Sequence, residues 1–172
     1  PNVAFANYFT GKSYLKTLNT KNIGIYNVTF EPKCRNNWHI HHKGGQILLC
    51  TDGEGWYQEE GKQAIKLTPG SVVYIPAEVK HWHGASKDAW FTHLAIEIPA
   101  DYATNEWCEP VDDETYNDNI YEYYKTVIDT NNDYKKLLSD MATISSKQKI
   151  KSDSLPIPIK ENLSLIHISE PT

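Results

Sequence analysis

Short segments that alternate between apolar and polar residues fill the chain from Ile23 to Ile98. Alternation places every second side chain of a strand on the same face, so these segments predict half-buried β-strands. Turn residues separate them, such as Gly61 in a tight hairpin and Pro76, which cannot donate a hydrogen bond to a neighbouring strand. Short strands at nearly even spacing are typical of a β-sandwich or a β-barrel. We therefore expect an all-β fold built from the segments IGIYNVTF, QILLCT, GWYQEE, KQAIKL, SVVYI, KHWHGAS and WFTHLAIEI.

Five of the seven histidines fall within two short stretches of this strand-rich region. His39, His41 and His42 lie in NWHIHH, and His81 and His83 lie in KHWHG. Because alternate residues of a strand share a face, His39 and His41 should point together, and so should His81 and His83. A single histidine in a strand is usually structural, but chance rarely gathers five of them into two clusters. Imidazole nitrogens bind divalent transition metals, so we predict that His39, His41 and His81 are metal ligands.

Gln46 opens the segment QILLC and is the fourth candidate ligand, because an amide oxygen can complete a site made of three imidazoles. Three neutral imidazoles and a neutral amide leave the charge of a divalent cation uncompensated by its ligands. Such a centre should be a strong Lewis acid that favours bound anions, and it should retain its metal weakly. His42 has the opposite strand parity to His41, so we expect its side chain to lie outside the site.

The first histidine cluster resembles the first motif of the cupin superfamily, whose fold is a double-stranded β-helix, or small jelly-roll barrel. That motif reads Gly, five residues, His-x-His, three or four residues, Glu, six residues, Gly. Here Gly53 is in place, whereas Lys33 replaces the first Gly and Gln46 replaces the Glu. The resemblance implies the cupin fold, and the replaced Glu implies a metal site of altered charge.

The second cluster resembles the second cupin motif, which reads Gly, five residues, Pro-x-Gly, two residues, His, three residues, Asn. Gly70, Pro76 and His81 match this pattern. Glu78 replaces the inner Gly and Ala85 replaces the Asn. Both halves of the cupin signature are therefore present, each with two departures.

A closer resemblance extends over roughly residues 7–117 and includes the segments YFTG, VTFEP, PGSVVYIP and THLAI. These segments are similar to a group of small single-domain cupins that includes bacterial manganese-dependent hydroxynitrile lyases. The group also includes cupin modules found beside carboxymuconolactone decarboxylase domains. The segment HHKGGQ is one residue longer here than in the lyases. The group's metal ligands match His39, His41, Gln46 and His81, and its further site histidines match His83 and His93.

The resemblance implies a metal-dependent enzyme that acts on a small molecule. The leading expectation is a lyase in which manganese is the Lewis acid and His83, or else His93, is the catalytic base, since an ordinary histidine pKa suits proton transfer. Iron, zinc and nickel are alternative metals. One alternative is a metal-dependent oxygenase or isomerase with the same ligands, and another is a binding module without turnover. We expect the pocket wall to come from Val28, Phe30, Leu48, Tyr74 and Phe91.

Composition divides the chain into three parts. Residues 1–110 are expected to form an N-terminal arm and the barrel. Residues 111–144 are expected to form a helical extension, because aromatic and apolar residues recur near helical spacing in DDETYNDNIYEYYKTVIDT. Residues 145–172 are polar with repeated prolines, so a disordered tail is expected. Residues 163–172 resemble a translated sequencing adapter, and His167 is therefore not a candidate ligand.

Charge and cysteine content narrow the classes of partner. The net charge of −5 argues against a nucleic-acid surface, and no run of apolar residues is long enough for a membrane span. No secretory signal pattern is visible, and Cys34, Cys50 and Cys108 lack CxxC spacing, so we expect a cytoplasmic protein without disulfides. The aromatic N-terminal segment NYFTGKSYL carries surface that a second subunit would cover, so we expect a homodimer.

Overall fold

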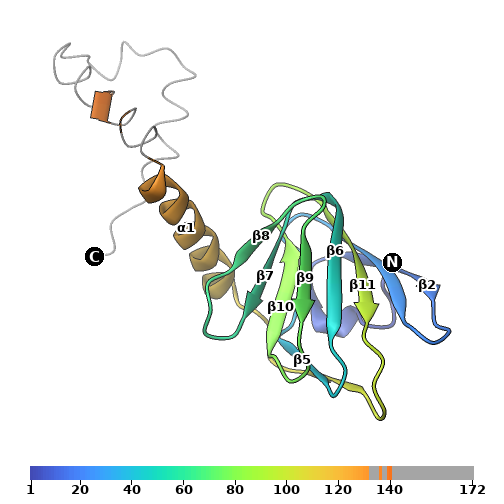
Figure 1. Cartoon of the computed structure of the whole chain (residues 1–172). Helices are drawn as coiled ribbons and strands as arrows, with labels where there is room; N and C mark the ends of the chain where they lie inside the picture. The colour runs from blue at the N-terminus through green and yellow to red at the C-terminus, as the bar shows by residue number, and fades with distance from the viewer. Residues whose placement is uncertain (132–135, 137–138, 141–172) are drawn as a thin grey trace. The chain divides into compact units, whose positions relative to one another are not determined.

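Two antiparallel β-sheets face each other in the part of the chain that the computed structural model describes, residues 1–131, 136 and 139–140 (Figure 1). Contacts group Pro1–Tyr124 into one compact unit and Lys125–Thr172 into another. All strands of the described residues belong to the first unit. They form a jelly-roll barrel, so the fold class expected from the sequence is confirmed.

Seven strands make up the first sheet: β1 (Phe9–Thr10), β4 (Arg35–Asn36), β5 (His39–His42), β7 (Gly55–Glu59), β8 (Ile65–Leu67), β10 (His81–Ala85) and β12 (Thr104–Trp107). Their order is β1-β4-β10-β5-β12, with β7 paired to both β10 and β8. Five strands make up the second sheet: β2 (Ser13–Asn19), β3 (Ile25–Phe30), β6 (Gln46–Gly53), β9 (Val72–Ile75) and β11 (Phe91–Glu97). Their order is β2-β3-β11-β6-β9. The two strands that carry the histidine pairs, β5 and β10, are therefore neighbours.

Every segment predicted as a strand from its alternation contains a strand of the barrel, with ends that differ by a few residues. The strands β1, β2, β4 and β12 and the short 3-10 helix η1 (Ala6–Tyr8) were not predicted. Three of the missed strands, β1, β2 and β12, lie at the edge of their sheet, and β4 is only two residues long. An edge strand is held by backbone hydrogen bonds to a single neighbour, so its side chains need not alternate clearly between core and solvent.

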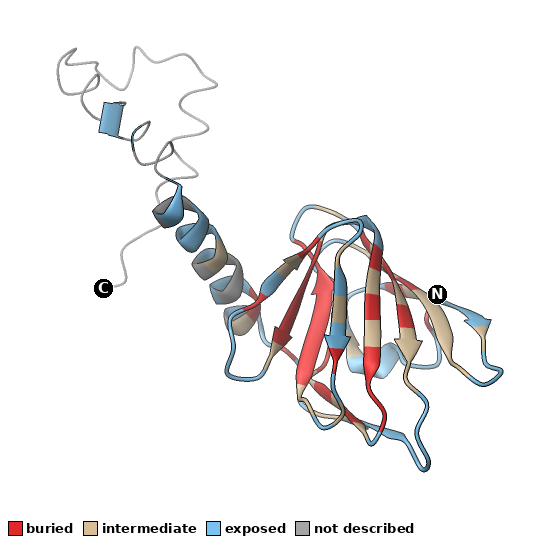
Figure 2. Cartoon of the chain, viewed as in Figure 1, coloured by how far each residue is buried: buried red, intermediate tan, exposed pale blue. Residues whose placement is uncertain are grey.

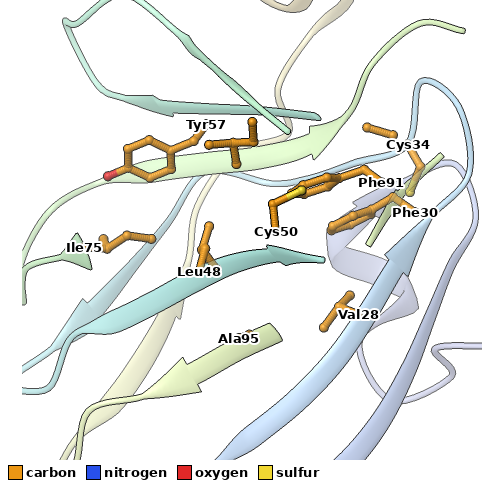
Figure 3. Close-up of a cluster of buried hydrophobic side chains, with 11 residues drawn as sticks. Val28, Phe30, Cys34, Leu48, Cys50, Tyr57, Ile75, Phe91 and Ala95 are labelled. Atoms are coloured by element: carbon orange, nitrogen blue, oxygen red, sulfur yellow. The ribbon is translucent and has the colours of Figure 1, made fainter. Parts of the chain in front are cut away.

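Apolar side chains from both sheets fill the space between them (Figure 3). Phe30 of β3 and Phe91 of β11 stack with ring centroids 5.8 Å apart, and Leu48 of β6 belongs to the same cluster. Buried residues alternate with partly exposed ones along β6 and β11, because one face of this sheet meets the core (Figure 2). Cys34 and Cys50 lie in the core, and burial raises the pKa of Cys34 to about 12. All three cysteines are free, so packing rather than disulfides holds the barrel.

Helix α1 (Asp113–Thr130) begins where Asp112 accepts a hydrogen bond at Oδ1 from the backbone N–H of Thr115, at 2.7 Å. Such a cap satisfies one of the free amide groups at the start of a helix. Tyr116 donates its hydroxyl proton to the carbonyl oxygen of Ala85 in β10, at 2.8 Å, and packs in a second buried cluster. The first turns of the helix are therefore attached to the first sheet.

The helix confirms the short C-terminal helical extension expected from the periodicity. The rest of that extension, up to residue 144, lies mostly outside the described residues. The tail expected over residues 145–172 lies wholly outside them, so the domain limits stay a prediction. Within the described part of the chain, no helix is both long and apolar enough to cross a membrane.

Candidate metal centre

The antiparallel strands β5 and β10 place His39 directly opposite His81. The ring centroids of these two residues lie 4.1 Å apart, and the ring of His41 lies 5.3 Å from that of His81. One nitrogen of each ring lies within 4.8 Å of the chosen nitrogens of the other two, and all three residues are buried. The structure thus brings three of the four predicted ligands to one place, where they could hold a metal ion.

Strand parity explains this convergence. His39 and His41 are buried along β5, while the residue between them and His42 are only partly buried. The side chain of His42 is 31% exposed and donates from Nδ1 to Glu78 at 2.6 Å and from Nε2 to Glu106 at 2.8 Å. These two carboxylates raise the pKa of His42, Glu78 having the larger effect. His42 therefore projects away from the three-histidine cluster, as its parity predicts.

Each imidazole of the cluster is oriented by a hydrogen bond from its Nδ1 to an oxygen atom. An oxygen acceptor requires the proton to lie on Nδ1, so the lone pair of Nε2 stays free for a cation. Burial lowers the pKa of His39 well below its ordinary value and that of His81 to about 4, which keeps both rings neutral, as metal ligands must be. The acceptors are Asn37 O for His39 (2.9 Å), Val79 O for His81 (2.9 Å) and Asn105 Oδ1 for His41 (2.8 Å).

Several buried polar atoms around the cluster lack a hydrogen-bond partner among the described residues. An unpartnered buried polar atom costs about 1–3 kcal/mol, so native proteins keep few of them. Divalent transition metals bind imidazole nitrogen and amide oxygen, so the residues that carry these atoms fit such an ion. The unpartnered atoms are His41 Nε2, His81 Nε2, Gln46 Oε1, and both ring nitrogens of His93.

Gln46 is the first residue of β6, and its buried amide turns inward. Its Nε2 donates to Oε1 of Glu97 at 2.7 Å, while its own Oε1 has no partner among the described residues. A carboxylate only accepts hydrogen bonds, so the amide nitrogen must face Glu97. The amide oxygen is thereby left free, as a ligand atom has to be.

The segment between His41 and Gln46 turns through two glycines that have no room for a side chain. A Cβ on Gly44 would lie 2.5 Å from the carbonyl oxygen of Ile98, and one on Gly45 would lie 2.5 Å from that of Ile75. The backbone therefore passes between two strand ends before β6 begins. Gln46 follows this turn, opens β6 and is buried.

His83 follows His81 on the same face of β10 and is also buried. Its ring centroid lies 5.6 Å from that of His39 and 6.2 Å from that of His81. Asn36 holds this residue twice: its Nδ2 lies 3.0 Å from Nε2 of His83, and its Oδ1 accepts from the His83 backbone N–H at 3.0 Å. His83 is therefore the histidine next to the three-histidine cluster.

His93 lies one ring further into the barrel. It is fully buried on β11, between Phe30 at 5.5 Å and Phe91 at 4.9 Å, and its ring meets that of His83 at 4.9 Å. Burial lowers the pKa of His93 to about 3, and burial together with the nearby imidazoles lowers that of His83 well below 6.5. The ordinary histidine pKa expected for these residues is therefore wrong, because the sequence does not reveal how completely the barrel excludes water from them.

A cavity of about 470 Å³ opens beside these histidines, and His39, His41, His83 and His93 belong to its lining. A largely apolar cavity of this size with a few polar groups suits a small organic molecule. Of the five wall residues expected from the sequence, Val28 and Phe30 line the cavity. Leu48 and Phe91 pack in the core cluster and do not line the cavity, so their expected place in the wall is wrong. Tyr74 is 62% exposed, so its expected place in the wall is wrong. It has the outward parity of β9, which alternation alone did not distinguish from the inward one.

Aromatic residues of the N-terminal arm pack on the chain's own barrel. Tyr8 stacks on Trp107 of β12 at 4.6 Å, and Phe9 stacks on Phe30 at 5.5 Å. Phe5, Phe9 and Trp107 also belong to the cavity lining. The aromatic surface that suggested a second subunit from the sequence is therefore used within the chain.

Three polar residues of the site were missed by reasoning from the sequence. Asn36 holds His83, Asn105 holds His41, and Glu97 holds Gln46. Asn36 and Asn105 carry no local signal, because each acts across a strand pair. Glu97 did carry one, since it has the same parity on β11 as His93.

Two departures from the cupin motifs keep the backbone shape of the glycine that they replace. Lys33 and Glu78 both have φ of 67°, a left-handed conformation that costs a residue with a side chain about 1–2 kcal/mol. Glu78 offsets part of this cost, since its Oε1 accepts from the backbone N–H of Lys43 at 2.9 Å. The fold therefore tolerates both replacements.

Comparison with known proteins agrees with this geometry. A model of the Cupin domain matches residues 26–96. The chain is 46% identical over 89 residues to an (R)-mandelonitrile lyase of Granulicella tundricola, across 52% of this chain and 67% of that protein. A crystal structure of a cupin-like protein from Thermotoga maritima matches with a TM-score of 0.63 and 42% identity, over 66% of this chain and 88% of that one.

A more distant structure supports the fold alone. A protein with a double-stranded β-helix domain from Klebsiella pneumoniae matches with a TM-score of 0.52 and 17% identity, over 58% of this chain and 87% of that one. The family model, the relative and the solved structures agree with each other and with the paired motifs. The chain therefore belongs to the cupin family, as a small cupin that resembles a hydroxynitrile lyase.

Proposed function

We propose that this cupin is a metal-dependent lyase that cleaves a cyanohydrin, or a related hydroxy-carbonyl compound, inside the barrel. One observation carries the proposal: buried atoms of His41, His81 and Gln46 that could bind a metal have no hydrogen-bond partner among the described residues. They lie beside a cavity that His83 and His93 help to line. The relative named a mandelonitrile lyase supports the choice of substrate class. Manganese is the metal we expect first, with iron, zinc and nickel as alternatives.

The ligands we propose are imidazole nitrogens of His39, His41 and His81 and the amide oxygen of Gln46. A bound metal supplies a Lewis acid that lowers the pKa of a coordinated hydroxyl group. The apolar part of the cavity, including Val28, holds the organic part of the substrate. The barrel also keeps water away from the reacting group.

His83 is our first candidate for the base, because it lies next to the three-histidine cluster. It accepts the substrate's hydroxyl proton at Nε2, the O–H electron pair becomes the new C=O bond, and the C–C bond breaks with its electrons on cyanide. Protonation of Nε2 displaces the hydrogen bond from Asn36, and burial already disfavours an imidazolium. His83 therefore returns the proton readily, and hydrogen cyanide leaves. His93 is the second candidate, because both of its nitrogens are free of partners among the described residues.

Turnover of mandelonitrile tests the proposal. Protein loaded with Mn²⁺ should release benzaldehyde faster than the same protein stripped of metal, measured at the same pH to account for spontaneous decomposition. His83→Ala should lower kcat while leaving the metal content unchanged. Consumption of dioxygen by the iron-loaded protein would instead indicate an oxygenase. Stoichiometric binding of metal and ligand without turnover of cyanohydrins, keto acids or lactones would instead indicate a binding module.

We also propose that the chain forms a homodimer through the outer face of the second sheet. An antiparallel sheet usually presents polar residues to solvent, but this face is apolar over three adjacent strands. Val72 and Tyr74 at its edge are each 62% exposed. The register of β11, β6 and β9 places the outward apolar residues of these strands side by side. They are Ile47, Leu49, Val72, Tyr74, Leu94 and Ile96.

Light scattering coupled to size-exclusion chromatography measures this association. The wild-type protein should have the mass of two chains, and Tyr74→Lys should have the mass of one, because a charge would be buried at the interface. Tyr102→Lys is the matched control, since Tyr102 is 86% exposed outside the sheets and its replacement should leave the dimer intact. A monomeric wild-type protein would contradict the proposal.

A further inference from the structure

Glu97 occupies a defined position beside the candidate metal centre. It is the last residue of β11 and pairs directly with Gln46 of β6. On its other side, its backbone N–H donates to the carbonyl oxygen of Gly24 at 2.9 Å. A Cβ on Gly24 would lie 3.2 Å from Cγ of Glu97, so the glycine leaves room for the side chain. The carboxylate is thus placed by neighbours on both sides, with 30% of the side chain exposed and in the cavity lining.

The two carboxylate oxygens reach two different candidate ligands. Oε1 of Glu97 accepts from Nε2 of Gln46 at 2.7 Å. Oε2 lies 3.5 Å from Nδ1 of His41, whose nearer acceptor is Asn105 at 2.8 Å. One side chain therefore supports the orientation of both the amide and an imidazole.

The amide contact decides which atom of Gln46 is available to a cation. Rotation of the amide by 180° exchanges oxygen and nitrogen at nearly the same shape, and an amide N–H group cannot act as a ligand. With Glu97 in place, the nitrogen is held and Oε1 is the free atom. Without Glu97, both orientations of Gln46 become accessible.

The same carboxylate changes the charge expected for the site. From the sequence, three imidazoles and an amide leave the charge of a divalent cation uncompensated by its ligands. The structure adds a charge outside the ligands, because the carboxylate of Glu97 contacts the amide of Gln46. The cupin motif has a negatively charged glutamate at the position of Gln46. Here the negative charge belongs to Glu97, which contacts the candidate ligand Gln46.

We propose that Glu97 is a positioning residue of the metal centre, which orients Gln46 through a hydrogen bond and supplies the site's negative charge. The proposal rests on the metal ligands proposed above. Residues that hydrogen-bond to metal ligands typically contribute 10- to 100-fold to metal affinity. Glu97→Gln is therefore expected to weaken Mn²⁺ binding by about 10- to 100-fold, measured by calorimetric titration of metal-stripped protein.

Exchanging the two residues provides a sharper test. Gln46→Glu alone sets two carboxylates against each other across the 2.7 Å contact, so it should not strengthen binding although glutamate is the better ligand. In the double variant Gln46→Glu/Glu97→Gln the hydrogen bond is restored in the reverse direction, and Mn²⁺ affinity should at least equal that of the wild type. The same Glu97→Gln change is thus harmful in the wild-type background and beneficial in the Gln46→Glu background, a reversal that a merely structural role does not produce.

Glu106→Gln is the matched control, because it removes a nearby carboxylate that contacts His42 rather than a candidate ligand. Its Mn²⁺ affinity should stay within about twofold of the wild type. If the wild type binds Mn²⁺ and all four proteins of the exchange series bind it equally, the role of Glu97 is refuted while the metal site stands. If the wild type binds no Mn²⁺, Co²⁺, Ni²⁺ or Zn²⁺, the proposed function and the role of Glu97 both fail.

Discussion

His41→Ala is expected to weaken divalent-metal binding by about 100-fold or more, while His42→Ala at the next position leaves it nearly unchanged. Four ligands of a typical protein zinc site together contribute about 10–16 kcal/mol, so one ligand contributes on the order of 3 kcal/mol. His41 is buried, and its Nε2 has no hydrogen-bond partner among the described residues. His42 projects to the other side of β5, where both of its nitrogens contact carboxylates.

Elemental analysis of freshly purified protein and titration of metal-stripped protein both measure this difference. The two variants lose the same side chain from adjacent positions of one strand, so a general effect of removing a histidine appears in both. Circular dichroism should show that each keeps its β-sheet content. Equal metal content in His41→Ala and the wild type would remove His41 from the ligands and undermine the proposed centre.

His93→Leu is expected to raise the free energy of unfolding of the metal-free protein by about 1–3 kcal/mol at pH 7. The ring of His93 lies between Phe30 and Phe91 with both nitrogens unpartnered among the described residues, and leucine removes these polar atoms at similar volume. Because a buried, unpartnered imidazole destabilises the fold, we expect His93 to be kept for a role in the cavity that it lines. Turnover should therefore fall in the same variant that gains stability.

The advantage of His93→Leu should grow as the pH falls. Burial holds the pKa of folded His93 at about 3, below the ordinary value of 6.5 that the unfolded chain has. Between these values the unfolded state binds the extra proton, so the wild type loses stability as pH falls from 6.5 towards 3. At pH 5 this amounts to about 2 kcal/mol for one histidine. Removing His93 removes this loss.

Urea unfolding at pH 7 and pH 5 separates the two effects. His93→Gln keeps a polar side chain but cannot titrate, so it should remain near wild-type stability at pH 7 and gain on it at pH 5. A stability difference between the wild type and His93→Leu that is the same at both pH values would show that folding does not lower the pKa of His93.

Much of the barrel follows from local pattern. Alternation between Ile23 and Ile98 predicted most strands of both sheets, because the side-chain period of a strand is set by its backbone. The same period correctly paired His39 with His41 and excluded His42 from the cluster. Helical spacing predicted α1 in the same way.

Pairing between distant strands determined the rest of the candidate site. The contact of Gln46 with Glu97 spans 51 positions and that of His41 with Asn105 spans 64, so neither leaves a trace in a local window. The outward parity of Tyr74 and the low pKa of His93 likewise depend on which face and which groups meet in the folded barrel. Local sequence set which residues share a face, because that depends only on neighbouring backbone geometry. The partners, burial and charge of those residues came from strands far apart in the chain.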